Sequence, residues 1–131
     1  MAANKTSLSA GSVIRDLLLK SKEVKEHTNK IFLVAVDKAV LPYILYRRAS
    51  MEQNPTKGNY PGADATTIEI VCYTAKYEDG VNLAEAVRAA LDGARGEKDG
   101  LVMRSCTLVD SEEGYESDAY AQQLVFNVKI S

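Results

Sequence analysis

"TTIEIVCYTAKYEDGVNLAEAVRAALDG", residues 66–93, decides the fold, because it joins a strand pattern to a helix pattern in one segment. Apolar side chains alternate in its first half, and a period of two residues is typical of a strand. Residues 66–77 are therefore expected to form a strand with both faces at least partly covered. One face carries Ile68, Ile70 and Cys72, and the other carries Glu69, Val71 and Tyr73.

The second half of this segment has the spacing of a helix. Asp79 or Asn82 can cap the first turn. Glu85 stands three residues after Asn82, as in a capping box, and Gly93 follows the last turn. The apolar stripe comprises Leu83, Val87 and Leu91, flanked by Ala84 and Ala90. These small alanines let the helix lie close to a sheet or to a neighbouring subunit.

A strand, a glycine turn and a helix start can also form a phosphate site, and Asp79-Gly80 raises that question. The segment holds a single glycine here, with neither GxGxxG nor GxxxxGK[ST] around it. Glu78 and Asp79 would repel an anion, whereas acidic residues at a helix start are explained by capping and by the helix dipole. The segment is therefore expected to have a structural role in the fold and not to form a phosphate site.

Upstream, residues 12–27 read as a short amphipathic helix with Ser12 as its cap. Dense β-branched and aromatic runs at 30–37 and 41–50 predict two strands, with Pro42 at the first residue of its strand or on an edge. Residues 51–64 have no apolar period and form a connection longer than a usual hairpin loop. The stripe of the first helix comprises Val13, Ile14, Leu17 and Leu18.

Downstream, residues 93–100 read as a polar loop, and residues 101–110 and 119–131 as strands separated by acidic turn material at 111–118. The order is helix, two strands, long loop, strand, helix, two strands, without βαβ alternation. This order predicts an α+β fold: a mainly antiparallel sheet of about four to five strands with two helices packed on one face. One domain is expected over 1–131, with 1–10 flexible.

Composition excludes several functional classes. The 131 residues are 46% hydrophobic and 26% charged, as in an ordinary globular protein, and the net charge of −2 argues against duplex nucleic acid as a partner. No apolar run is long enough to span a bilayer, and the first residues do not resemble a secretion signal. We expect no membrane partner and synthesis in the cytoplasm.

Reactive groups are few. The candidate metal ligands are His27 and the two cysteines, Cys72 and Cys106, which are far apart in the sequence. We expect His27 to be an exposed histidine at a helix end and the cysteines to be reduced structural thiols. The Glu112-Glu113 pair lies in expected turn material, where nothing indicates a pocket that would raise a carboxyl pKa. We therefore expect no catalytic residue, no cofactor and no bound metal.

Arg47 and Arg48 follow two tyrosines in a predicted strand, where they could bind phosphate or a base. Successive strand residues point to opposite faces, so the two arginines form one patch only if the strand bulges. Pairing with carboxylates of a neighbouring strand or subunit is the commoner outcome.

Four segments together resemble one known family. They are "VIRDLLL" near the start, "LPYILYRRAS", the stretch from "TIEIVCYTAKY" to "AALDG", and the terminal "ESDAYAQQLVFNVKI". In this combination the chain resembles, over nearly its whole length, the tail completion proteins of tailed bacteriophages and prophages, also called tail terminator or head-to-tail joining proteins.

The resemblance implies a small α+β subunit that assembles with itself into a ring, typically of six copies, through head-to-tail contacts. Such a ring lies in the tail or neck of the virion, between the head-tail connector protein and the tail tube protein. It ends tube growth and leaves a channel through which phage DNA passes without sequence-specific binding. The resemblance implies no catalytic residue in this chain.

The loop at 51–64 matches no fixed feature of the family. Its extended reach of at most about 50 Å exceeds the roughly 14 Å radius of gyration of such a domain, so it can reach a neighbouring subunit. Folding back onto its own domain is about equally probable. The candidate interaction residues are Tyr60 and Pro61 as anchors, Lys57, Arg47 and Arg48.

An alternative from a different class is a small cytoplasmic binding or enzymatic domain. It would use a pocket between the sheet and the helices, with Cys72 or Cys106 as the nucleophile. The rate at which a thiol reagent labels the native protein separates the two hypotheses.

Overall fold

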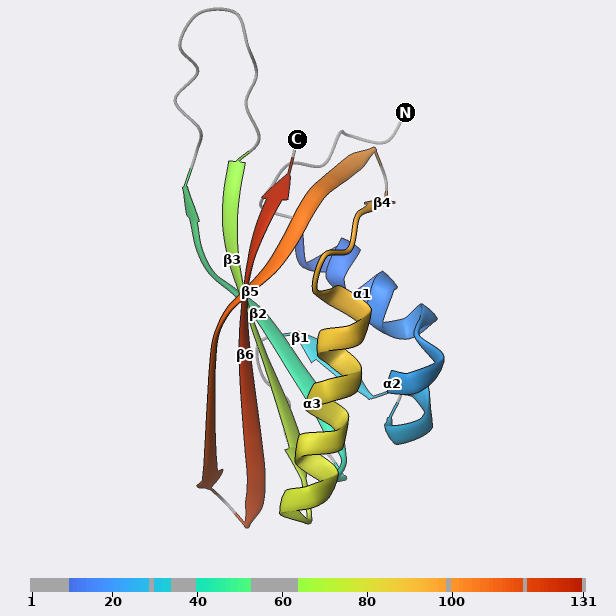
Figure 1. Cartoon of the computed structure of the whole chain (residues 1–131), viewed down its shortest axis with the longest axis vertical. Coiled ribbons are helices and arrows are strands. Elements are labelled where there is room, and N and C mark those ends of the chain that lie inside the picture. The colour runs from blue at the N-terminus through green and yellow to red at the C-terminus, as the bar shows by residue number, and fades with distance from the viewer. Residues whose placement is uncertain are drawn as a thin grey trace, which may run out of the picture.

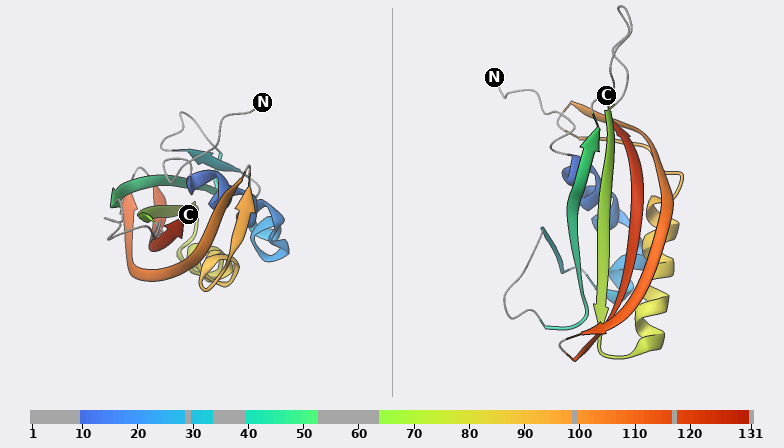
Figure 2. Two further views of the ribbon diagram at one scale, coloured as in Figure 1. Left: turned by 90° about the horizontal axis from the view of Figure 1, so that it is seen from above. Right: turned by 90° about the vertical axis from the view of Figure 1, so that its left-hand side faces the viewer.

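A computed structural model of the chain describes residues 10–28, 30–33, 40–52, 64–98, 100–116 and 118–130. Three helices lie on one side of a six-stranded sheet that curls strongly along its length (Figure 1 and Figure 2). The elements are α1 (Ala10–Lys20), α2 (Lys22–His27), β1 (Ile31–Leu33), β2 (Tyr43–Glu52), β3 (Asp64–Thr74), α3 (Tyr77–Leu91), β4 (Gly96–Lys98), β5 (Leu101–Glu116) and β6 (Ala119–Ile130).

The sheet has the order β1-β2-β3-β6-β5-β4. Only β1 and β2 run parallel, and the other four pairings are antiparallel. The predicted α+β class with a mainly antiparallel sheet is thus confirmed, whereas the expected four to five strands and two helices were too few. The short strand β4 lies inside the segment expected to be a loop, and its three residues are too few to show a period.

The first expected helix is two helices, because the chain breaks at Ser21. The Ser21 hydroxyl accepts a hydrogen bond from the backbone N–H of Val24 at 3.3 Å and so caps α2. Ser12 lies within α1, so its assignment as a cap was wrong. Val13, Ile14 and Leu18 of the predicted stripe are buried, and Leu17 packs against them.

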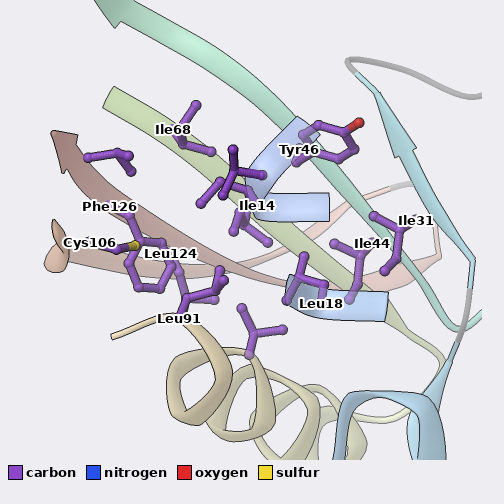
Figure 3. Close-up of a cluster of buried hydrophobic side chains, with 14 of the residues drawn as sticks. Ile14, Leu18, Ile31, Ile44, Tyr46, Ile68, Leu91, Cys106, Leu124 and Phe126 are labelled. Atoms are coloured by element: carbon purple, nitrogen blue, oxygen red, sulfur yellow. The ribbon is translucent and has the colours of Figure 1, made fainter. Parts of the chain in front are cut away.

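The core lies between the helices and one face of the sheet. Even-numbered positions of β3 and β6 point into it, including Ile68, Ile70 and Cys72, each 0% exposed. Figure 3 shows Ile14 and Leu18 of α1 among side chains of the sheet, and Leu91 of α3 close to Phe126 and Leu124. The predicted faces of β3 and the predicted stripe of α3 are confirmed by this burial.

Helix α3 starts earlier than the sequence indicated. Lys76 is the residue before its first turn, and Asp79 and Asn82 lie inside the helix, so neither is the cap. Gly80 is buried in the first turn against β3: an added Cβ would lie 2.9 Å from Thr74 Oγ1. Gly93 follows the helix with a φ of +81°, as expected for a glycine after a helix end.

Strand β5 is longer than predicted. Residues 111–116, expected to be turn material, continue β5 and pair with β6 through Glu116 and Ala119. Their side chains are all exposed, so no burial alternation marks them as a strand. The register shifts between Met103 and Ser105 and again between Leu108 and Asp110, which bends the strand. We call residues 109–116 and 118–123 the hairpin arm.

Several predictions fall on residues that the structure does not describe. Met51 and Glu52 belong to β2 and Asp64 to β3, while 53–63 lie outside the described residues. Residues 1–9 and 34–39 also lie outside them, so only Ile31–Leu33 of the strand expected at 30–37 is seen. Pro42 directly precedes β2.

Candidate assembly surfaces

The face of the sheet that points away from the helices carries odd-numbered positions of β2, β3 and β6. We call it the open face, because no described helix packs against it (Figure 2). On the central strands β3 and β6 its side chains are partly buried, and the apolar Val71 and Val125 lie beside the polar Glu69 and Gln123. Three cross-strand rows make up this surface: Tyr43–Tyr73–Ala121–Gly114, Leu45–Val71–Gln123–Glu112 and Arg47–Glu69–Val125–Asp110.

A shallow groove of about 390 Å³ runs along the open face where β6 meets the outer part of β5. Val71, Tyr73 and Ala121 line its floor, and Glu112 and Glu116 stand at its side. A groove with an apolar floor and an acidic side suits a protein surface better than a phosphate-bearing ligand.

Five tyrosines gather at the end of the sheet where α3 begins. Tyr43 stacks on Tyr73 with ring centroids 5.0 Å apart, and Tyr120 meets Tyr115 at 4.8 Å and Tyr77 at 5.9 Å. Tyr115 and Tyr77 are 61% and 48% exposed. Tyrosines are enriched in the buried centres of protein interfaces, so this end is a candidate docking surface.

Carboxylates hold these tyrosines in place. Glu113 accepts hydrogen bonds from the Tyr77 hydroxyl and from Gln122 Nε2, both at 2.9 Å. The Gln122 bond, followed by the Tyr77 bond, lowers the pKa of Glu113, and the Glu113 bond raises the pKa of Tyr77. The Tyr73 hydroxyl donates to Glu116 at 3.0 Å. Burial, followed by that hydrogen bond, raises the pKa of Tyr73 to about 12. Hence the arm is tied to both α3 and β3.

The hairpin arm is strongly acidic. Between residues 105 and 128 the chain has five carboxylates and neither Lys nor Arg. The five are Asp110, Glu112, Glu113, Glu116 and Asp118. This field repels nucleic acid and attracts a basic protein surface.

Two stretches of strand edge lack a strand neighbour within the described part of the chain. β4 pairs with β5 only from Leu101 to Met103, and β1 pairs with β2 only from Ile44 to Tyr46. On the outer edge of β5, the backbone N–H groups of Leu108 and Ser111 donate to carboxylates of Asp92 and Asp110 at 3.0 and 2.8 Å. Unpaired strand edges are templates for another strand.

Arg47 forms an ion pair with a carboxylate of a neighbouring strand, which is the outcome that the sequence favours. Its Nε and Nη2 both lie 2.7 Å from Oε2 of Glu69 on β3. Arg48 is exposed and belongs to the opposite face of the strand. Lys57, Tyr60 and Pro61 lie outside the described residues. An interaction role for these five residues stays a prediction.

The cysteines do not fit the role of nucleophile. Cys72 and Cys106 are both 0% exposed, and burial raises the pKa of each thiol to about 12. A thiol with a raised pKa holds little of the reactive thiolate at neutral pH. The groove of about 270 Å³ between α2, α3 and the sheet is lined by His27 and Asp79, and neither cysteine is among its lining residues.

His27 is the last residue of α2 and is exposed, as expected. Within the described ranges, no three His, Cys, Asp or Glu side chains gather closely enough to hold a metal ion. None of the described helices is long and apolar enough to cross a bilayer.

Comparison with known protein families decides the family. The model of the tail completion protein gp17 family matches residues 12–131. The chain belongs to this family. It is therefore a phage tail structural protein, which confirms the resemblance seen in the sequence, and its family consists of virion components and not of enzymes.

Solved structures share the fold of this tail completion protein. A chain of the virion of a native gene transfer agent particle superposes with a TM-score of 0.75 at 15% identity, covering 96% of this chain and 98% of that chain. A second solved chain superposes with a TM-score of 0.61 at 10% identity, covering 92% of this chain and 95% of that chain. No curated protein sequence matches the chain.

Proposed function

We propose that this tail completion protein forms a closed ring, of six copies, at the end of a phage or prophage tail. The ring terminates the tail tube and joins it to the head-tail connector. Membership of the tail completion family over residues 12–131 carries this proposal. The similar fold of a chain from a gene transfer agent virion supports it, because that chain belongs to an assembled particle.

The surfaces of the subunit suit such a role. A ring of identical subunits needs two different faces on each copy that recognise each other. In its described part, the subunit has an acidic hairpin arm, two strand edges without a strand neighbour and exposed tyrosines. The tube protein and the connector protein are the expected partners beyond the ring itself.

In this proposal, DNA passes through the ring without sequence-specific binding. The net charge of −2 and the acidic arm disfavour tight phosphate contacts. A channel that does not bind DNA tightly lets it move. The subunit is made in the bacterial cytoplasm and is retained in the neck of the virion.

Tube termination tests the proposal. Purified tail tube protein from the same phage is allowed to polymerise with and without the chain, and tube lengths are measured by electron microscopy. We expect shorter tubes with the chain present and a ring of density at one tube end. Heat-denatured chain serves as the control. Tubes of unchanged length with bare ends, at a molar excess of chain, would falsify the proposal.

A further inference from the structure

The two strand edges that have no strand neighbour among the described residues lie at opposite sides of the same sheet and carry opposite charge. The edge of β5 from Val109 onward carries Asp110, Glu112 and Glu113, and its residues are exposed. The edge of β2 beyond Tyr46 begins with Arg47 and Arg48, both exposed. The edges are therefore complementary in charge.

Strand direction allows these edges to pair. β2, β3, β6 and β5 alternate in direction, because each is antiparallel to the next. If a second copy lies beside the first in the same orientation, its β2 runs antiparallel to β5 of the first copy. The antiparallel alternation then continues from one subunit to the next, as in a closed sheet.

Residue register brings opposite charges together on the open face. Arg47, Glu69, Val125 and Asp110 form one cross-strand row, so a sheet that continued without stagger would set residues 111–113 beside Ile44–Tyr46, which already pair with β1. A stagger of two residues, about 7 Å, sets Arg47 of the next copy beside Glu112, which lies on the same face, and sets Val109 near Ser50. Arg47 uses Nε and Nη2 for Glu69, which leaves Nη1 for a second carboxylate.

From these observations we propose that the β5 edge at Val109–Glu113 pairs with the β2 edge at Arg47–Ser50 of a second copy of this chain. Glu112 meets Arg47 of that copy, and Asp110 lies two residues away on the same face. This contact rests on the proposed ring and specifies its subunit interface. Val109, 57% exposed on the β5 edge, supplies apolar area that the contact covers. The interface is heterologous, so it can close a ring.

Reciprocal charge reversal tests the contact. Glu112→Arg places a positive side chain where the proposed contact faces Arg47 of the next copy. The double variant Arg47→Glu/Glu69→Arg places a carboxylate opposite Glu112 of the neighbouring copy and keeps the internal ion pair in reversed form. Glu85→Arg, on an exposed position of α3, is the control with the same charge change. Circular dichroism and thermal midpoints establish that each variant is folded.

Association is measured by sedimentation velocity and native mass spectrometry at low ionic strength. We expect each edge variant alone to associate about tenfold more weakly than the wild type, because like charges then face each other. An equimolar mixture of the two edge variants should recover association, since every contact between the two variants then joins opposite charges at positions 112 and 47. Glu85→Arg should associate like the wild type.

Edge variants that associate like the wild type, or a mixture that does not recover, would overturn this contact. A wild-type chain that stays monomeric at about 1 mM would overturn it as well. The tube-termination assay on the same proteins separates the two ideas. If Glu112→Arg and the wild type both shorten tubes equally, the ring proposal stands and the edge contact falls.

Discussion

Gly80 of α3 lies so close to Thr74 of β3 that a Cβ on the glycine would be 2.9 Å from the threonine Oγ1. That Oγ1 also donates a hydrogen bond to the carbonyl oxygen of Lys76 at 2.7 Å, so it is not free to move away. The short connection between β3 and α3 therefore fixes the position of the first turn of the helix against the sheet.

We expect Gly80→Ala to destabilise the protein by about 1–3 kcal/mol, because the added methyl overpacks this contact. The effect should appear although alanine is the better helix former. Gly114→Ala is the matched control, since nothing lies within 4 Å of a Cβ there. Urea unfolding of both variants measures the difference, and a Gly80→Ala protein as stable as Gly114→Ala contradicts the expected clash.

Ser21→Ala should destabilise the protein by about 1 kcal/mol, because it removes the cap of α2. Asn at this position should restore most of the loss, since its side chain can accept the same hydrogen bond from Val24. Thermal unfolding of the three proteins gives the comparison. If Ala and Asn behave alike, the hydroxyl does not act as a cap.

Local patterns predicted the parts of the fold that are buried on one side. The alternation of Ile68, Ile70 and Cys72 with residues of the other face and the stripe of Leu83, Val87 and Leu91 are properties of short segments, so they could be seen in the sequence. The choice between Ser12 and Ser21 as a cap could not, because either serine precedes a helical pattern. Where the chain breaks depends on how α1 packs.

The hairpin arm shows why the remaining features were missed. Glu112 and Glu113 belong to a strand because they pair with Gln123 and Gln122, yet their exposed side chains follow no pattern. The Arg47–Glu69 ion pair likewise depends on the register of β2 against β3. Free edges and cross-strand rows are properties of the assembled sheet, and a single sequence does not contain them.

Thiol labelling should separate the structural reading from the enzymatic alternative. We expect a neutral aromatic disulfide reagent to modify Cys72 and Cys106 very slowly in the native protein, because both are buried and both pKa values are raised to about 12. In denaturant, both thiols should react at once, and this sample is the control for reagent and protein. Rapid labelling of the folded chain at neutral pH would return the nucleophile hypothesis to consideration.

The last prediction concerns the tie between β3 and the tip of the arm. Burial and the hydrogen bond to Glu116 raise the pKa of Tyr73 from 10.0 to about 12. A folded-state pKa above the unfolded value means that this tie contributes its full stability below pH 10 and loses it as the pH rises through about 12. Near-ultraviolet absorbance of phenolate, compared between the wild type and Tyr73→Phe, follows this one group.

The difference between the two titrations should show no phenolate from Tyr73 until the pH approaches about 12. Glu116→Gln is the control, because it removes the neighbouring charge and leaves burial, the larger cause, in place. Tyr73 should then titrate earlier than in the wild type and still above 10.0, the ordinary tyrosine value. A Tyr73 that ionises at that ordinary value in the folded wild-type protein would show that the arm is not held against β3 in solution.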